Sequence, residues 1–355
     1  MKPDYELPIP DHFDPEKAKE VWRVPYEQLA QKAQTWREKH HIQPAIEDDF
    51  RIALFVVDNQ NTFCLPDFEL FVAGRSGTGA IEDTRRLVEF LYRNLGVISE
   101  ITVTMDTHQA VQIFHAIFFI NDQGEHPDPL TQIGVEDIRE GRWKFNPAVA
   151  ASLGIDPQYG QRLVQFYVEE LSKRGKFDLT LWPYHSMLGG IGHALVSSFE
   201  EALFFYTVAR YQQPDFILKA RNPLTERYSA LSPEVTRGPD GRKLGEKNIE
   251  VFEQLQSADA FVIAGQAKSH CVAWTIEDLL ADIRQQDESL VDKIYLLEDC
   301  TSPVVVPDVV DYTDQAEAAF ERFAQAGMHR VRSNEPIASW PGIKIPASQE
   351  KASMV

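Results

Sequence analysis

From Arg51 onward, short apolar runs alternate with longer segments in which apolar residues recur at helical spacing. The apolar runs show no polar face, which is typical of strands buried on both sides in a parallel sheet. They lie at 52–57, 101–105, 179–182, 216–218, 260–264, 294–297 and 329–331. Helical spacing occurs at 80–95, 197–211, 247–257, 271–285 and 314–326. Strands separated by helices predict an α/β fold, a three-layer α/β/α sandwich around a mainly parallel sheet.

Three segments fall outside this alternation. Residues 1–48 predict an N-terminal extension, with an open proline-rich start and then a helix over 15–40. The stretch at about 120–177 is rich in proline, glycine and charge, with one helix near 161–173. We expect it to be an insertion in the main domain of 49–335, forming a flap or a subunit contact. Residues 336–355 contain three prolines and predict an extended tail.

Composition excludes several classes of protein. With 35 basic and 54 acidic residues the net charge is −19, so the chain would repel a nucleic-acid backbone and no nucleic-acid partner is expected. No apolar run approaches the ~18 residues of a membrane span, and the start lacks the apolar core of a signal peptide. The three cysteines are widely spaced, which predicts reduced thiols and a cytoplasmic location.

Polar side chains of reactive types follow the predicted strands. They are Asp58, Asp106 with His108, His185 and Lys219, and Cys271 lies six residues past Gly265. Ligands of an open parallel sheet bind beyond the carboxyl ends of its strands. A carboxylate, a lysine, a thiol and a set of metal-binding side chains are therefore expected at one edge of the sheet.

Four motifs at these strand ends resemble those of the isochorismatase-like cysteine hydrolases, and are most similar to those of the nicotinamidases. The motifs are Asp58-Asn-Gln-Asn-Thr-Phe-Cys64, Trp182-Pro-Tyr-His185, Lys219 with Tyr228-Ser229, and Gly265-Gln-Ala-Lys-Ser-His-Cys271-Val. They occur in the family's order over about residues 50–333. The resemblance implies the three-layer sandwich and a catalytic triad of Asp58, Lys219 and Cys271. It also implies a cis peptide at Gln266–Ala267.

The chemistry of the three side chains suits those roles. A thiolate is the reactive form of cysteine, and Cys271 is predicted to open a helix whose dipole and free N–H groups favour an anion. Lys219 adds a positive charge, and Asp58 can take the thiol proton and return it to departing ammonia. The N–H groups of Ala267 and Cys271 are the expected oxyanion hole. The other two cysteines, Cys64 and Cys300, are expected to be structural.

A divalent metal site is predicted beside the triad. Asp106, His108 and His185 supply one carboxylate and two imidazoles, ligands that suit Zn²⁺, Fe²⁺ or Mn²⁺. The resemblance implies that the ion holds the pyridine nitrogen of the substrate. His115 is a candidate fourth ligand, or a hydrogen-bond partner of a ligand. The alternative is a hydrogen-bonded histidine pair that binds no metal.

Aromatic residues are matched by position to those that flank a flat ring in the family. Phe63 and Trp182 are expected to contact the substrate, and Tyr228 to line the mouth of the pocket. The alternative for each is an ordinary core aromatic. The chain also departs from the family, with Thr62, Ser186 and Leu231 at positions where nicotinamidases carry other residues, so recognition of the ring is the least specific part of the resemblance.

We therefore expect a cysteine-dependent amidohydrolase that converts nicotinamide or a related aromatic amide to the acid and ammonia through a thioester. Its partner would be a small-molecule amide substrate, and no association with a membrane is expected. The resemblance implies a homo-oligomer. One alternative is a metal-free cysteine hydrolase of another C–N bond, such as an N-carbamoyl or ureido compound. Another is a non-catalytic scaffold whose extension and insertion bind partner subunits.

Overall fold

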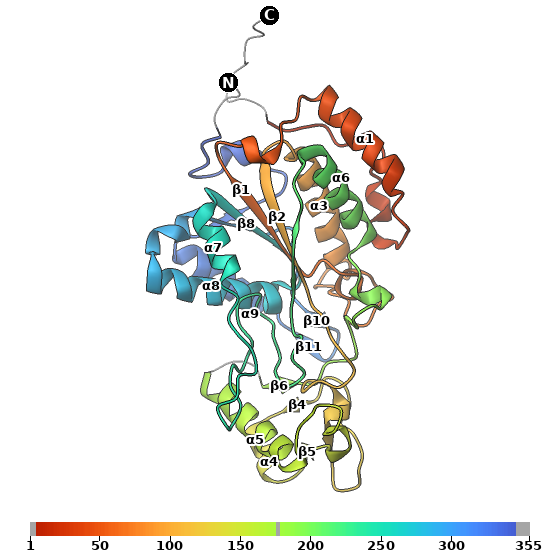
Figure 1. The fold of residues 1–355 in the computed structure, drawn as a ribbon, viewed down its shortest axis with the longest axis vertical. Helices are drawn as coiled ribbons and strands as arrows, with labels where there is room; N and C mark the ends of the chain where they lie inside the picture. Colours follow the sequence, from red (N-terminus) through yellow and green to blue (C-terminus); the bar gives the residue numbers. More distant parts are fainter. Residues whose placement is uncertain (1–4, 175–177, 346–355) are drawn as a thin grey trace, which may run out of the picture.

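The chain is described by a computed structural model that covers residues 5–174 and 178–345 (Figure 1). Within these residues a central parallel sheet lies between two groups of helices, and a smaller folded insertion lies at one end of the sheet. No helix in these two ranges has the length and apolar character needed to cross a membrane.

Six strands form the central sheet, in the order β12-β9-β8-β1-β2-β7, and every neighbouring pair is parallel. Their bounds are β1 Ile52–Val57, β2 Ile98–Met105, β7 Asp215–Leu218, β8 Ala260–Gly265, β9 Ile294–Leu297 and β12 His329–Val331. Each corresponds to an apolar run of the sequence. The predicted α/β class and the parallel sheet are confirmed.

Alternate residues of β1 divide between two hydrophobic cores, which makes the fold three-layered. Leu54 and Val56 belong to the core that also contains residues of α1, α3 and α6, whereas Phe55 and Val57 belong to the core formed with α7, α8 and α9. Figure 1 shows these two groups of helices on opposite sides of the sheet. The helix bounds are α1 Tyr26–Lys39, α3 Gly79–Arg93, α6 Ser197–Arg210, α7 Glu250–Ser257, α8 Ala273–Gln286 and α9 Thr313–Gln325.

The insertion has more structure than the single helix expected from sequence. It contains α4 and α5 and two short antiparallel strand pairs, β3 with β5 and β4 with β6. Their bounds are α4 Val135–Arg139, α5 Pro157–Arg174, β3 Phe119–Ile120, β5 Lys144–Phe145, β4 Gln132–Ile133 and β6 Leu179–Thr180. Phe118, Phe119 and Tyr167 help to build a separate core here, which explains how so polar a segment folds.

The apolar run at 179–182 was therefore wrongly placed in the central sheet. Only Leu179–Thr180 is a strand, and it pairs with β4 in the insertion. A short apolar run shows that a segment is buried but does not show in which core. The last three residues assigned to the insertion, 175–177, lie outside the described part of the chain.

The helix expected over 15–40 is interrupted. A short 3₁₀ helix spans Pro15–Lys19, and α1 begins only at Tyr26. Pro25 lacks a donor and disfavours helical geometry in the residue before it, which explains the break. In the gap, the backbone N–H of Trp22 donates to the Ser197 hydroxyl at 2.9 Å, and that hydroxyl donates to the Trp22 carbonyl at 3.0 Å. The N-terminal segment is thus tied to the start of α6.

The C-terminal segment is not extended where the structure describes it. Residues Ile337–Ser339 form a 3₁₀ turn, and the following Trp340 is buried. Its ring stacks on Phe90 of α3 at 5.7 Å and on Tyr295 of β9 at 5.5 Å. This apolar stacking folds the segment back against the body of the protein, whereas prolines alone suggested an open chain. Residues 346–355 of the predicted tail lie outside the described part.

The remaining elements are short and lie in the connections between the main helices and strands. They are α2 Asn61–Cys64, the hairpin of β10 Val305–Val306 and β11 Val310–Asp311, the 3₁₀ turns Ala45–Glu47, Ala116–Phe118, Pro147–Val149, Ile191–His193 and Glu288–Lys293, and a π-helical turn at Lys268–Val272 that leads into α8.

Candidate active site

Side chains from four strand ends converge at one edge of the sheet. Asp58 directly follows β1, Asp106 follows β2 and Lys219 follows β7, while Cys271 lies in the π-helical turn after β8. Because all of these strands are parallel, their carboxyl ends lie at the same edge. His185 reaches this edge from the chain that leaves the insertion.

Lys219 contacts both Asp58 and Cys271. Its Nζ lies 2.5 Å from Oδ2 of Asp58 and donates to Sγ of Cys271 at 3.2 Å. It also donates to the backbone carbonyl of Tyr228 at 2.9 Å. An ammonium group has three N–H donors, so these three contacts fix its position. The structure therefore brings together the three side chains that the sequence motifs singled out.

Asp58 is held in an uncommon conformation. Its φ angle is +45°, in the left-handed region that few non-glycine residues adopt. Its N–H donates to the carbonyl and to the hydroxyl of Thr104, each at 3.1 Å, and the Thr104 hydroxyl lies 2.6 Å from Asp58 Oδ1. Local strain persists where surrounding contacts enforce it. Here those contacts point the carboxylate at Lys219.

Burial has the largest effect on the pKa of the Cys271 thiol. Burial raises the pKa of Cys271 well above its usual value, while Lys219 opposes this rise. Burial also raises the pKa of Asp58, and Lys219 again opposes it. For Lys219, burial acts to lower the pKa, but Asp58 and Cys271 outweigh it and the pKa is raised. The resting site is thus a protonated thiol beside a carboxylate of raised pKa.

The other two cysteines lack these partners. Burial raises the pKa of Cys64 and of Cys300 as well, so a raised pKa alone does not distinguish the three thiols. Cys64 lies next to Asn59, and Cys300 lies beside Asp299. Only Cys271 among them has an ammonium group within hydrogen-bond distance in the described residues. Contact with Lys219 is what makes Cys271 different.

The turn before Cys271 carries a cis peptide between Gln266 and Ala267, at the position that the family resemblance implied. Backbone bonds fix this turn on both sides. The Gln266 N–H donates to the Val57 carbonyl at 2.7 Å, and the Lys268 N–H donates to the Ser302 carbonyl at 2.8 Å. The N–H of Ala267 donates to no backbone acceptor within the described ranges. It remains available to a ligand.

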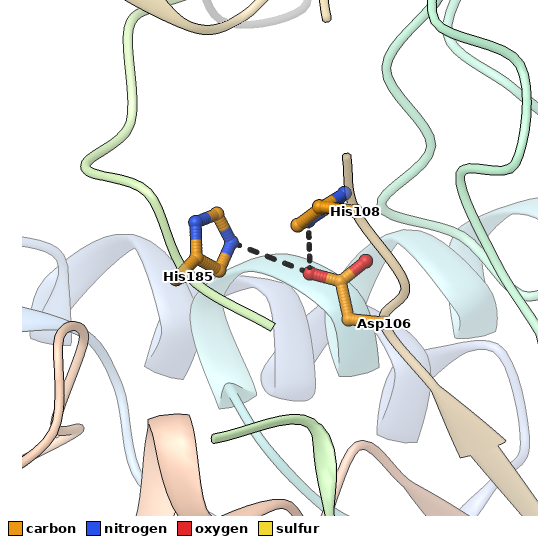
Figure 2. Close-up of side chains that lie close together, drawn as sticks. All are labelled: Asp106, His108 and His185. Atoms are coloured by element: carbon orange, nitrogen blue, oxygen red, sulfur yellow. Dashed lines mark hydrogen bonds and ion pairs between the residues drawn. The ribbon is translucent and has the colours of Figure 1, made fainter. Parts of the chain in front are cut away.

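Asp106, His108 and His185 form a compact group of candidate metal ligands (Figure 2). Nε2 of His108 lies 2.7 Å from Oδ2 of Asp106, and Nε2 of His185 lies 3.4 Å from the same oxygen. All three residues are buried. Burial raises the pKa of Asp106, but His108 and Lys219 outweigh it and hold that pKa well below its usual range. The carboxylate is therefore ionised.

The hydrogen bonds of His185 show that this group fits a cation. Nδ1 of His185 lies 2.7 Å from the Pro183 carbonyl, which can only accept, so Nδ1 carries the hydrogen. The other ring nitrogen, Nε2, faces Oδ2 of the ionised Asp106 at 3.4 Å, which places it where it could share a cation with that carboxylate. A carbonyl on the opposite ring nitrogen is the usual support of a metal-binding histidine. Burial also lowers the pKa of His108, which favours a neutral ring.

His115 lies next to this group and is not part of it. Its ring centroid is 6.0 Å from that of His108 and 6.3 Å from that of His185. Nδ1 of His115 donates to the Ala110 carbonyl at 3.1 Å, and its buried Nε2 has no partner among the described residues. Burial, followed by the two neighbouring histidines, lowers the pKa of His115 to about 3. His115 is therefore a neutral ring that lies beside the two candidate histidine ligands.

The predicted aromatic residues lie around the site in two places. Phe63, in α2, packs its ring 5.7 Å from that of His185. Trp182 donates from Nε1 to the Tyr228 hydroxyl at 2.8 Å, and both rings lie 5.6 Å from that of His270, the residue before Cys271. One aromatic group thus adjoins the candidate metal ligands and the other adjoins the thiol.

Sequence reasoning did not single out Gln60. Its side chain accepts from the Asp106 N–H at 2.7 Å and donates to the carbonyls of Asp106 and His193, each at 2.9 Å. Gln60 therefore connects the backbone of Asp106 to the loop that follows His185. The sequence could have indicated this role only through the position of Gln60, two residues after Asp58 in the first motif.

No family model matches the chain. No curated protein matches it by sequence. Among solved structures it is similar to an Acinetobacter baumanii nicotinamidase and pyrazinamidase, with 19% identity over 79% of this chain and 96% of that one and a TM-score of 0.47.

Two further solved structures have lower scores. A Pyrococcus horikoshii pyrazinamidase in complex with zinc is 18% identical, over 79% of this chain and 98% of that one, with a TM-score of 0.38. An N-carbamoylsarcosine amidase from Thermoplasma acidophilum is 15% identical, over 81% and 98%, with a TM-score of 0.39. These proteins are of the isochorismatase-like family whose motifs the chain resembles. At such values the likeness by itself says nothing about substrate or mechanism.

Proposed function

We propose that the protein is a cysteine-dependent amidohydrolase of the nicotinamidase type, converting nicotinamide or a related aromatic amide to the acid and ammonia. The observation that carries the proposal is the position of Lys219. One buried ammonium group contacts a carboxylate at 2.5 Å and a thiol at 3.2 Å, and these are the nucleophile and proton carrier that amide cleavage needs.

In the first half-reaction Asp58 takes the proton from Cys271 and the sulfur attacks the amide carbon. The C–S bond forms as the C=O electrons move to oxygen, and the oxyanion is held by the N–H groups of Ala267 and Cys271. Asp58 then gives its proton to the amide nitrogen, the C–N bond breaks and ammonia leaves. The raised pKa of Asp58 suits it to hold the proton between these steps.

In the second half-reaction water hydrolyses the thioester. Asp58 takes a proton from water, whose oxygen attacks the thioester carbon, and the C–S bond breaks. The thiol of Cys271 regains its proton and the acid is released. Lys219 remains charged throughout, because the groups around it raise its pKa. One amide and one water thus give one acid and one ammonia.

A divalent ion would be held by Asp106, His108 and His185. When bound, it supplies a coordination position for a ring nitrogen of the substrate. Phe63 on one side and the pair Trp182 and Tyr228 on the other supply apolar surface for a flat ring. These residues would anchor and orient the amide, while the triad carries the bond changes.

Release of ammonia tests the proposal. Wild-type protein supplied with Zn²⁺, Fe²⁺ or Mn²⁺ should release ammonia from nicotinamide or a related aromatic amide, and Cys271→Ala should release none. Cys300→Ala, which removes another buried thiol, is the matched control and should retain activity. Release only from N-carbamoyl or ureido compounds, by protein without metal, would indicate the other C–N hydrolase. An inactive wild type whose Cys271 is no more reactive to a thiol probe than Cys300 would indicate a scaffold.

A further inference from the structure

A buried carboxylate on α3 has no part in the chemistry described above. Asp83 is 2% exposed, and its neighbours along the buried side of α3 include Leu87, Val88 and Leu91. Burying a carboxylate costs free energy unless polar partners compensate, and an apolar residue of similar size is often at least as stable. Its presence in this helix therefore suggests a role other than stability.

Asp83 is bonded to the turn that precedes Cys271. Nε2 of Gln266 donates to Oδ2 of Asp83 at 2.9 Å, and Oε1 of Gln266 accepts from the Ser302 N–H at 3.3 Å. The other oxygen of Asp83 accepts from Arg86 at 2.9 Å. Both ends of the Gln266 amide are thus occupied, so the rotation of this side chain is fixed.

Gln266 is the residue directly before Ala267, whose N–H is available to a ligand. The backbone bonds of the turn attach it to β1 through Val57 and to the segment after β9 through Ser302. Gln266 adds a connection to α3, in the helical layer on one side of the sheet. Gly265, just before it, packs so close that an added Cβ would lie 2.0 Å from the Val57 carbonyl oxygen. The turn is tightly enclosed, and the Gln266 side chain links it to α3.

We propose that Asp83 is a positioning residue that acts through Gln266 to fix the direction of the Ala267 N–H, and so sets how strongly the site binds an oxyanion. This inference rests on the amide hydrolysis proposed above. Burial raises the pKa of Asp83 to about 6, which leaves it mainly ionised at pH 7.5 and able to accept from Gln266, Arg86 and the side chain of Ser302. A donor misplaced by even a fraction of an ångström stabilises an oxyanion poorly.

The test separates oxyanion binding from thiol reactivity. Asp83→Leu, which has no acceptor, and Gln266→Met, which has no amide donor, both remove the bond, and Glu89→Gln on the same helix is the matched control. An aldehyde carrying the substrate's ring adds reversibly to the thiol and places its oxygen in the oxyanion hole. Iodoacetamide alkylates the thiol by displacement and needs no oxyanion hole. The two reagents therefore report on different parts of the site.

Both variants should lose about tenfold to hundredfold in kcat and in aldehyde affinity. KM for the amide and the alkylation rate of Cys271 should stay within about twofold of wild type, and Glu89→Gln should behave as wild type. Unchanged kcat and aldehyde affinity would overturn the proposal, as would a parallel loss of alkylation, which would indicate a general structural role. Gln266→Met keeps the test open if Asp83→Leu does not fold.

Hydrogen exchange gives a readout that does not depend on turnover. Amides of residues 265–272 should exchange faster in both variants than in wild type, while those of β12 should not change. If wild type hydrolyses no amide, the proposed function fails, and faster exchange would still support Asp83 as the support of this turn. Unchanged exchange in the turn would reject the positioning role whatever the reaction.

Discussion

The ammonium nitrogen of Lys219 lies 3.2 Å from the sulfur of Cys271, and both side chains are almost fully buried. Water cannot screen this pair well, so the charge of Lys219 acts on the thiol at close to full strength. It opposes the rise in pKa that burial imposes on Cys271. The reactivity of the thiol should therefore depend on this one contact more than on the helix that follows it.

Replacing Lys219 should make Cys271 less reactive. A cation beside an ionisable group shifts its pKa by about one to three units, so Lys219→Met should slow alkylation of Cys271 by iodoacetamide at pH 7.5 at least about tenfold. The rate is measured by mass spectrometry of the peptide that contains Cys271. Lys247→Met, which removes a lysine paired with Asp282, is the control and should alkylate at the wild-type rate. Equal rates in both variants would contradict a role for Lys219 in activating the thiol.

Replacing Asp58 should change thiol reactivity and turnover in opposite directions. The carboxylate of Asp58 raises the pKa of Cys271, so Asp58→Asn should lower that pKa and speed alkylation at pH 7.5. Turnover should fall about 10²- to 10⁴-fold, because no group then carries the proton to the leaving nitrogen. Alkylation and ammonia release are measured on the same preparation. If both rates fell together, Asp58 would be supporting the site's structure and not its proton transfer.

Loss of one candidate ligand should remove the metal. Wild type should bind about one divalent ion per chain, and His185→Gln or Asp106→Asn should lower its affinity by more than about 100-fold. Bound metal is measured by elemental analysis after dialysis against a fixed concentration of free ion. His126→Gln is the control, because Nδ1 of that ring donates to the Phe119 carbonyl inside the insertion. Wild type that retains no ion at any concentration tested would contradict the site.

Much of the fold and of the candidate site could be predicted because the relevant signals are local. The run Ile52–Val57 is apolar at every position, and a polar residue of reactive type follows it. The strands that precede Asp106 and Lys219 are less uniformly apolar, but each also ends in an apolar residue that a polar residue of reactive type follows. Since parallel strands share one carboxyl edge, local pattern and a simple topological rule suffice to place these side chains together.

The remainder depends on contacts between distant segments. The bond from Gln266 to Asp83 joins residues 183 positions apart, and the local sequence around neither residue predicts this contact. The run at Leu179 pairs within the insertion because aromatic residues there build a core of their own. Trp340 folds the C-terminal segment back by stacking on Phe90. Each of these features is decided by tertiary packing, which outweighs local preference.

Docking of the N-terminal segment should depend on the protonation of His12. Its ring lies 3.1 Å from the Tyr92 hydroxyl on α3 and packs against Phe205 of α6. Burial lowers the pKa of His12 to about 4, with Lys32 adding to this effect and Asp11 opposing it, and Glu201 lies 3.9 Å away. A histidine in an unfolded chain titrates near 6.5. The folded protein thus holds the neutral ring and resists its protonation.

The sign of the pH effect follows from this lowered pKa. The contribution of His12 to stability is fully present above about pH 6.5 and is lost as the pH falls from 6.5 towards 4. The difference in unfolding free energy between wild type and His12→Gln should therefore shrink by about 1 kcal/mol between pH 7.5 and pH 5.0, after allowance for partial exposure. It is measured by urea unfolding at both values of pH. His41→Gln, at an exposed position, is the control and should show the same small difference from wild type at both pH values. A constant difference for His12→Gln would show that docking does not hold its ring neutral.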